Sequence, residues 1–166
     1  MKRTSWGWIA AQASRGGLGR IVLPLPSREQ VLLDLGQELG EEDPDLVPFL
    51  ERIERYLEGI PVDLDDAWDQ EVGTSFQRTV WRATQRIPRG QTRSYGQVAQ
   101  AIGRPRSGRA VGQALATNPL PILIPCHRVV ATDGSLKGFA CGLEMKRRLL
   151  TLEGVAVSQC PERARA

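Results

Sequence analysis

The feature that most constrains the fold of this chain is a pair of short helices joined by a glycine-containing turn. Ser94 and Gln97 have the spacing of a capping box, which predicts a helix that runs to Ile102. Gly103 can end that helix in the left-handed conformation, and Ser107 can begin a second helix with an apolar face. Two short helices across such a turn are typical of a helix-turn-helix.

Charge divides the chain near Val72. Residues 1–72 contain 7 Lys and Arg and 15 Asp and Glu, a net charge of −8, whereas residues 73–166 contain 15 and 4, a net charge of +11. The basic part is either a solvated face or a surface for a polyanion such as nucleic acid. We therefore predict an acidic N-terminal domain over 1–72, a basic domain over 73–154 and a C-terminal tail over 155–166.

The acidic part combines strand and helix patterns. Two apolar runs, 6–13 and 18–25, flank a glycine-rich turn and predict a β-hairpin. Ser27 is followed by Gln30 at capping-box spacing, which predicts a helix through Leu39. A further helix is indicated by apolar residues that share one face, namely Phe49, Leu50, Ile53 and Leu57. The acidic stretch that follows, residues 59–72, has no clear period and is typical of a connector.

The basic part contains two more predicted helices and one turn. Apolar spacing predicts a helix over 76–87 that ends before Pro88, and a last helix over 143–150 that ends at Gly154. Between them, Asp133 and Gly134 are typical of a turn.

A cysteine and a histidine follow a buried apolar segment. Residues 122–124 indicate a buried strand, and Pro125, Cys126 and His127, the only histidine, come directly after it. A thiol becomes a nucleophile when a nearby base or cation favours its thiolate. Neighbours on a strand face opposite sides, so His127 would have to reach Cys126 through a bend or a water. For the pair taken alone, a structural cysteine beside a packed histidine is the other interpretation.

The stretch from Asn118 to Val130 resembles the active-site signature of the O6-alkylguanine-DNA alkyltransferases. Further segments match the family in order: 94–96, 109–112, 133–139 and 149–154. The resemblance runs nearly without gaps from Phe76 to Gly154, whereas residues 1–72 match only loosely. Because ordered motifs at fitting spacings rarely agree by chance, the chain is identified from its sequence as a member of this family.

The resemblance implies an α+β chain. It would have a small N-terminal α/β domain, ribonuclease-H-like around an antiparallel sheet, and a mainly helical C-terminal domain with the helix-turn-helix. The implied activity is direct-reversal DNA repair, in which a flipped guanine gives the alkyl group on O6, typically methyl, irreversibly to a cysteine of the protein. O4-alkylthymine is a further candidate substrate. The resemblance also implies a monomer that needs no cofactor or metal and binds double-stranded DNA through the minor groove. This binding should be largely independent of DNA sequence and should weaken as the salt concentration rises.

The resemblance assigns catalytic roles to five residues. Cys126 would accept the alkyl group, His127 would act as base through a bound water, and Glu153 would support His127. Asn118 would hold the turn that shapes the site. Tyr95 would help rotate the nucleotide and donate a proton toward the guanine ring.

Other residues are expected to contact DNA or to line the substrate pocket. Arg109 would enter the space vacated by the flipped base. The other expected DNA contacts are Ser94, Tyr95, Arg104, Arg106 and Arg128. The expected pocket residues are Pro121, Val129, Phe139, Ala140 and Cys141. Phe139 stands where relatives often carry tyrosine, which leaves the donor role to Tyr95, and Cys141 is either a packing residue at the rim or a second alkylation target.

Three other functions fit parts of the sequence. Alkyltransferase-like proteins bind lesions without repairing them, but they lack the thiol that Cys126 supplies. A helix-turn-helix transcription factor would leave residues 125–128 unexplained. A cysteine hydrolase would leave the helical pair unexplained, and it would turn over.

The sequence also bears on location. Residues 1–7 lack the apolar region of a secretory signal, and no apolar run approaches the ~20 residues of a membrane helix. Cys126, Cys141 and Cys160 are too few and too far apart for a disulfide framework, and with one histidine a zinc site is not expected. We therefore predict a cytoplasmic protein, associated with the nucleoid in a prokaryote, and no membrane partner.

Overall fold

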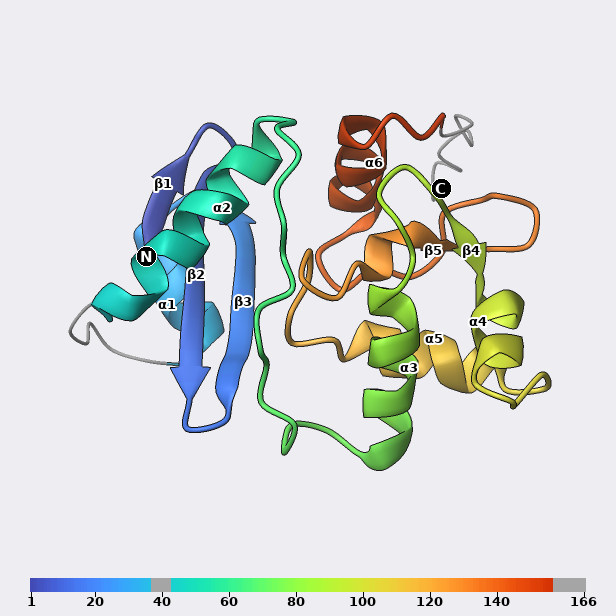
Figure 1. Ribbon diagram of the computed structural model, residues 1–166. Coiled ribbons are helices and arrows are strands. Elements are labelled where there is room, and N and C mark those ends of the chain that lie inside the picture. Colours follow the sequence, from blue (N-terminus) through green and yellow to red (C-terminus); the bar gives the residue numbers. More distant parts are fainter. Residues whose placement is uncertain (37–42, 157–166) are drawn as a thin grey trace, which may run out of the picture.

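The computed structural model describes residues 1–36 and 43–156, and these residues form two lobes that lie side by side (Figure 1). The N-terminal lobe holds a sheet with helices, and the C-terminal lobe is mainly helical. The α+β class predicted from the sequence is confirmed. Within the described ranges, no helix is both long enough and apolar enough to cross a membrane.

The N-terminal lobe is a three-stranded antiparallel sheet in the order β1-β2-β3. Its strands are β1 (Lys2–Thr4), β2 (Gly7–Ser14) and β3 (Gly17–Leu25), so the predicted hairpin is confirmed and one short strand precedes it. Side chains alternate across the sheet, as the strand period of two requires. Ile9 and Ile21 face the main core, whereas Ala10 and Val22 pack with Val31 of the first helix in a smaller cluster.

Two helices, α1 and α2, pack against the sheet. The helix α1 (Arg28–Leu35) begins as predicted, because the Ser27 side chain accepts a hydrogen bond from the Gln30 backbone. It ends earlier than predicted, because Gly36 takes the left-handed conformation at its C-cap (φ 66°). The helix therefore ends at Leu35, four residues before the predicted end at Leu39, which lies outside the described residues. The helix α2 (Val47–Leu57) follows a single 3-10 turn (Pro44–Leu46).

The connector between the lobes is irregular but contributes to the core. Residues 59–72, all of them described, contain no helix and no named strand, and Leu18 forms an isolated bridge with Trp68. Trp68 is buried and meets Trp81 edge to face, with ring centroids 5.9 Å apart. One cluster of buried side chains consequently extends through both lobes.

The C-terminal lobe is built on four helices and one pair of very short strands. The helices are α3 (Ser75–Gln85), α4 (Tyr95–Ala101), α5 (Gly108–Ala116) and α6 (Leu143–Leu152). The strands β4 (Arg93–Ser94) and β5 (Val129–Val130) pair in parallel. This pairing joins the start of α4 to the segment that follows Cys126.

The helix ends of this lobe agree with the predicted caps except at one residue. Both hydrogen bonds of the Ser94 and Gln97 capping box are present, and Gly103 has a positive φ of 71° after α4. Ser107 stands at the N-cap of α5, but its side chain makes no capping hydrogen bond, so this part of the prediction is wrong. Thr74 forms an unpredicted capping box at the start of α3.

Residues 122–124 are buried but are not a strand. Ile122 has a positive φ of 74°, and the Ile124 amide donates to the Leu120 carbonyl at 2.8 Å, which closes a tight turn. Pro121 and Pro125 lack the amide hydrogens that a strand ladder needs, which is why the apolar run bends instead of pairing. A 3-10 turn, η2 (Cys126–Arg128), follows at once.

Candidate active site

Cys126 begins the 3-10 turn η2 and is 6% exposed. Its Sγ lies 3.0 Å from Nδ2 of Asn118, and the same amide group donates to the Ile124 carbonyl at 2.9 Å. The Oδ1 of Asn118 accepts from the Leu120 amide at 3.0 Å. Asn118, placed directly after α5, thus satisfies the backbone of the bent segment and holds the thiol in position.

His127 is fully buried, and its ring nitrogens have different surroundings. Nε2 lies 3.0 Å from Oε1 of Glu153. Because an ionised carboxylate only accepts hydrogen bonds, this contact places the ring hydrogen on Nε2 and leaves Nδ1 as an acceptor. Nδ1 is buried and has no hydrogen-bond partner among the described residues. Burial lowers the pKa of His127, so the neutral ring can take up a proton at Nδ1.

Glu153, just past the end of α6, is the centre of this hydrogen-bond network. Its Oε1 accepts from Nη2 of Arg128 at 2.7 Å and from the hydroxyl of Tyr56 at 2.6 Å, and its Oε2 accepts from Nε of Arg128 at 2.9 Å. Burial would raise the pKa of Glu153, but the hydrogen bonds from His127 and Arg128 outweigh it and hold the pKa well below its usual range. The carboxylate is therefore charged at neutral pH.

Arg128 was expected from the sequence to contact DNA, and the structure places its guanidinium elsewhere. Besides the three hydrogen bonds from Nε and Nη2 to Glu153, Nη1 donates to the Ile87 carbonyl at 2.5 Å. The side chain is only 12% exposed. An arginine is the usual partner of a buried carboxylate, since its fork of donors matches both oxygens. We therefore reassign Arg128 from the DNA surface to the support of Glu153.

Lys146 belongs to the same region and was missed in the sequence. It is 1% exposed, and its Nζ donates to the carbonyls of Val129 at 2.6 Å and Lys137 at 3.0 Å. It lies on α6 three and four positions before the buried Leu149 and Leu150, so it shares their inward face. A lysine on the apolar face of a predicted helix was the available signal. Cys126, Asn118, His127, Arg128, Lys146 and Glu153 are called the acceptor cluster below.

Burial governs the protonation of the thiol. It raises the pKa of Cys126 to about 11, against the opposing effects of the Asn118 hydrogen bond and the positive charge of Lys146. Burial likewise lowers the pKa of Lys146 to about 8, while the charge of a Cys126 thiolate opposes that shift. The resting thiol is therefore protonated at neutral pH, and a nucleophilic reaction requires a base to remove its proton.

A second region, the groove, is a hollow of about 640 Å³ between the helical pair and the segment after β5. It is lined by Tyr95, Gly108, Arg109, Gly112, Gln113, Ala116, Ala131, Thr132, Lys137 and Gly138. The structure thus brings Tyr95 and Arg109 together, although they lie on different helices. The hydroxyl of Tyr95 donates to the Lys137 carbonyl at 2.8 Å. Burial raises the pKa of Tyr95, and the charge of a Cys126 thiolate raises it further, so this phenol stays protonated as a donor.

The other expected site residues fall in different places. Arg104 and Arg106 are exposed, with the Arg104 guanidinium 5.6 Å from the centre of the Phe76 ring, and Ser94 caps α4. The five expected pocket residues do not line the groove in the described part of the chain. Pro121 and Val129 are buried, Phe139 packs half-buried against the core, and Ala140 and Cys141 are exposed.

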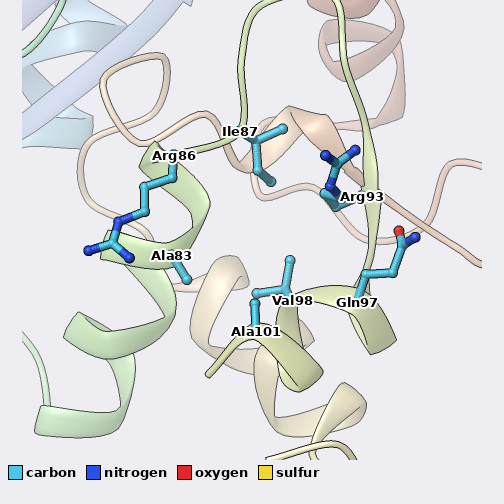
Figure 2. A pocket seen from close by; sticks show the side chains of 7 residues that line it. All are labelled: Ala83, Arg86, Ile87, Arg93, Gln97, Val98 and Ala101. Atoms are coloured by element: carbon cyan, nitrogen blue, oxygen red, sulfur yellow. The ribbon is translucent and has the colours of Figure 1, made fainter. Parts of the chain in front are cut away.

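A smaller hollow of about 270 Å³ lies between α3 and the start of α4 (Figure 2). Arg86 and Arg93 lie on opposite sides of it, with Ile87 and Val98 between them. No member of the acceptor cluster lines this hollow, so it is separate from Cys126. Among the described residues, no group of three or more His, Cys, Asp and Glu side chains is arranged to hold a metal ion.

Comparison with known sequences matches this chain to one family and to individual relatives. Residues 75–155 match the family described as "6-O-methylguanine DNA methyltransferase, DNA binding domain". The chain is 44% identical over 130 residues to an inducible methylated-DNA–protein-cysteine methyltransferase of Bacillus subtilis, a match over 75% of this chain and 69% of that protein. A methylated-DNA–protein-cysteine methyltransferase of Mycobacterium bovis is 44% identical over 128 residues, 77% of this chain and 72% of that protein.

The solved structures agree with the sequence comparison. The crystal structure of Mycobacterium tuberculosis OGT in complex with DNA aligns with a TM-score of 0.70 and 38% sequence identity. The alignment covers 85% of this chain and 83% of that chain, so the similarity includes the N-terminal lobe as well as the helical one.

Proposed function

This chain belongs to the family of the methylated-DNA–protein-cysteine methyltransferases, and we propose that Cys126 is the residue on which it accepts the alkyl group. The activity is direct-reversal repair of O6-methylguanine. The observation that carries the assignment of Cys126 is the acceptor cluster. It combines a buried, protonated thiol with a neutral histidine whose Nδ1 is without a partner among the described residues.

The proposed reaction is a single displacement at the alkyl carbon. A bond forms between Sγ of Cys126 and the methyl carbon, while the bond between that carbon and O6 of guanine breaks. The thiol proton passes to Nδ1 of His127, through a bound water where the two are not in contact. Glu153 stabilises the imidazolium that forms, and Arg128 keeps Glu153 ionised and in place. The thioether product has no reverse path, so each molecule acts once.

Three side chains lower the barrier, two of them next to the thiol and one on the side of the leaving group. Asn118 Nδ2 donates to Sγ, and the ammonium of Lys146 lowers the pKa of Cys126, so both stabilise the developing thiolate. On the side of the leaving group, the hydroxyl of Tyr95 can donate toward the guanine ring as negative charge develops there.

We place the DNA on the face that carries the groove. Support comes from the net charge of +11 in residues 73–166, from the exposed Arg104, Arg106 and Arg109, and from the relative that was crystallised with DNA. In this proposal α5 lies in the minor groove of a duplex, and Arg109 fills the space of a guanine flipped toward Cys126. Phosphate contacts by arginine predict that binding weakens as salt rises.

Peptide mass spectrometry after incubation with a duplex that contains one O6-methylguanine tests the proposal. We expect one methyl group per protein molecule, on the peptide that contains Cys126, in proportion to the lesion lost. Cys141→Ser should be methylated as the wild type is, whereas Cys126→Ser should bind the duplex without gaining mass. A methyl group on Cys141, or tight binding with no change in mass, would contradict the assignment.

A further inference from the structure

A tyrosine from the N-terminal lobe reaches into the acceptor cluster. Tyr56 lies on α2, is 2% exposed, and points its hydroxyl at two members of the cluster. The hydroxyl lies 2.6 Å from Oε1 of Glu153 and 3.3 Å from Nε2 of His127, which are 97 and 71 residues away in sequence. The reaction proposed above assigns this hydroxyl no role.

The direction of these hydrogen bonds follows from charge. Burial and the negative charge of Glu153 raise the pKa of Tyr56, so its hydroxyl stays protonated and donates to the carboxylate. Its oxygen is then free to accept, and Nε2 of His127 lies within hydrogen-bond distance of it at 3.3 Å. Nε2–H is therefore shared between Glu153 at 3.0 Å and Tyr56 at 3.3 Å.

Arg89 holds the tyrosine ring in place relative to both lobes. Its guanidinium carbon lies 5.4 Å from the centre of the Tyr56 ring. Nη2 of Arg89 also donates to the carbonyls of Gly59, just past α2, at 3.0 Å and Leu152, at the end of α6, at 3.3 Å. The position of the hydroxyl is consequently fixed by contacts with both lobes, and not by α2 alone.

We propose that Tyr56 is a positioning residue for alkyl transfer: its hydroxyl holds His127 in the tautomer with hydrogen on Nε2, which keeps Nδ1 ready for the proton of Cys126. The inference rests on the proposed function, which it deepens by giving the N-terminal lobe a part in the rate of transfer as well as in stability. With the hydroxyl removed, one acceptor for Nε2–H and one donor to Glu153 disappear. The ring then has a weaker preference between its tautomers and orientations.

The only histidine of the chain makes the tautomer directly measurable. The ¹⁵N chemical shifts of the imidazole distinguish a protonated from an unprotonated nitrogen, and here they arise from His127 alone. In the protein without DNA, we expect the wild type to show hydrogen on Nε2. Tyr56→Phe, which keeps the ring under Arg89, should show both tautomers or an averaged shift.

A matched control separates this effect from a general loosening between the lobes. The indole of Trp68 in the connector donates to Oε1 of Gln85 on α3 at 3.2 Å, a hydrogen bond that includes neither Tyr56 nor any member of the acceptor cluster. Gln85→Leu deletes that one hydrogen bond, as Tyr56→Phe deletes those of the hydroxyl. We expect Gln85→Leu to keep the tautomer of the wild type, even where both variants melt at a lower temperature.

Single-turnover kinetics give the second measurement. At a saturating concentration of a duplex with one O6-methylguanine, Tyr56→Phe should transfer the methyl group about tenfold more slowly, as expected for a lost hydrogen bond to a charged group. Its affinity for the duplex should stay within about twofold of the wild type, because the groove is unchanged. Gln85→Leu should transfer at the rate of the wild type.

The outcomes are distinguishable. A Tyr56→Phe protein with both the tautomer and the rate of the wild type would overturn the inference. If that variant fails to fold, Arg89→Met serves instead, since it leaves the hydroxyl but frees the ring, and a rate and a tautomer like those of the wild type would again overturn it. A wild type that transfers no methyl group to Cys126 would contradict the proposed function, whereas the tautomer comparison needs no DNA and would still test the hydroxyl.

Discussion

The acceptor cluster and the groove differ in burial and in what satisfies their polar atoms. The charged members of the cluster are tied to one another or to backbone carbonyls, and His127 and Lys146 are at most 1% exposed. The groove is open, and Arg109 on its wall is exposed. The contrast shows that the cluster is ordered in the protein alone, whereas in the binding mode proposed above the groove would be completed by the duplex. Substitutions in the acceptor cluster and substitutions in the groove should therefore impair the protein in different ways.

Replacing the nucleophile should give the largest effect and the sharpest contrast. Cys126→Ser keeps the shape of the side chain but provides a hydroxyl that His127 cannot usefully ionise. We expect transfer to fall by more than about a thousandfold, with duplex affinity nearly unchanged. Rapid-quench assays and fluorescence anisotropy measure the two quantities. Loss of affinity in step with activity would show that the two regions are not separable.

Breaking the network at Glu153 should cost stability as well as rate. Glu153→Gln leaves the largely buried Arg128 guanidinium without a charge partner, which should lower the free energy of unfolding by about 3 kcal/mol. Glu144→Gln is the matched control, because it breaks only the exposed pair with Arg147 and should cost less than about 0.5 kcal/mol. Urea unfolding of both variants measures the difference. Equal losses would mean that the buried Glu153 contributes no more to the free energy of unfolding than the exposed Glu144 does.

A change in the groove should depend on the form of the substrate. Arg109→Ala removes the side chain proposed to fill the space of the flipped base, so transfer from a duplex should slow by about tenfold or more. Transfer from the free base O6-methylguanine needs no flipping and should proceed at the rate of the wild type. Parallel assays on the two substrates test this, and equal slowing on both would place Arg109 in the chemistry instead.

The pH dependence of stability near pH 6 should report on His127. Burial keeps the pKa of His127 in the folded protein below its ordinary value of 6.5. Below pH 6.5 the unfolded chain therefore binds more protons than the folded one, and the free energy of unfolding should fall as the pH drops, by up to about 1.4 kcal/mol per unit. Urea unfolding between pH 7 and 5.5 measures the slope. His127→Gln should remove it, and an unchanged slope in that variant would assign it to other groups.

The helices were predictable because their signals are local. Ser94, Gln97 and Gly103 set the ends of α4 from within a few residues, and the structure has the predicted caps there. Residues 122–124 were predicted to form a strand, but an apolar run shows only that the segment is buried and not that its backbone is extended. The prolines on either side decided the geometry, and a positive φ at Ile122 is not visible in composition.

The site was predictable only where residues belong to a motif. Cys126, His127 and Glu153 were named through a family resemblance, and the structure brings His127 and Glu153 into contact. Tyr56 was missed because its partners are 71 and 97 residues away, a pairing that only the packing of the two lobes creates. Arg128 was assigned to the DNA surface because it lies in the basic part of the sequence. Its charged partner in the structure is the buried Glu153.

The parallel pair of β4 and β5 bears on how this site could be moved into another protein. Two adjacent parallel strands need a long crossover between them, and here it contains the whole helical pair and Cys126. A peptide of the Pro125–Arg128 type would bring the thiol without the strand that aligns it. The smallest unit that a designer could graft thus runs from Arg93 to Val130, and it would still require a host that offers a lysine on a packed helix and a carboxylate just past the end of that helix.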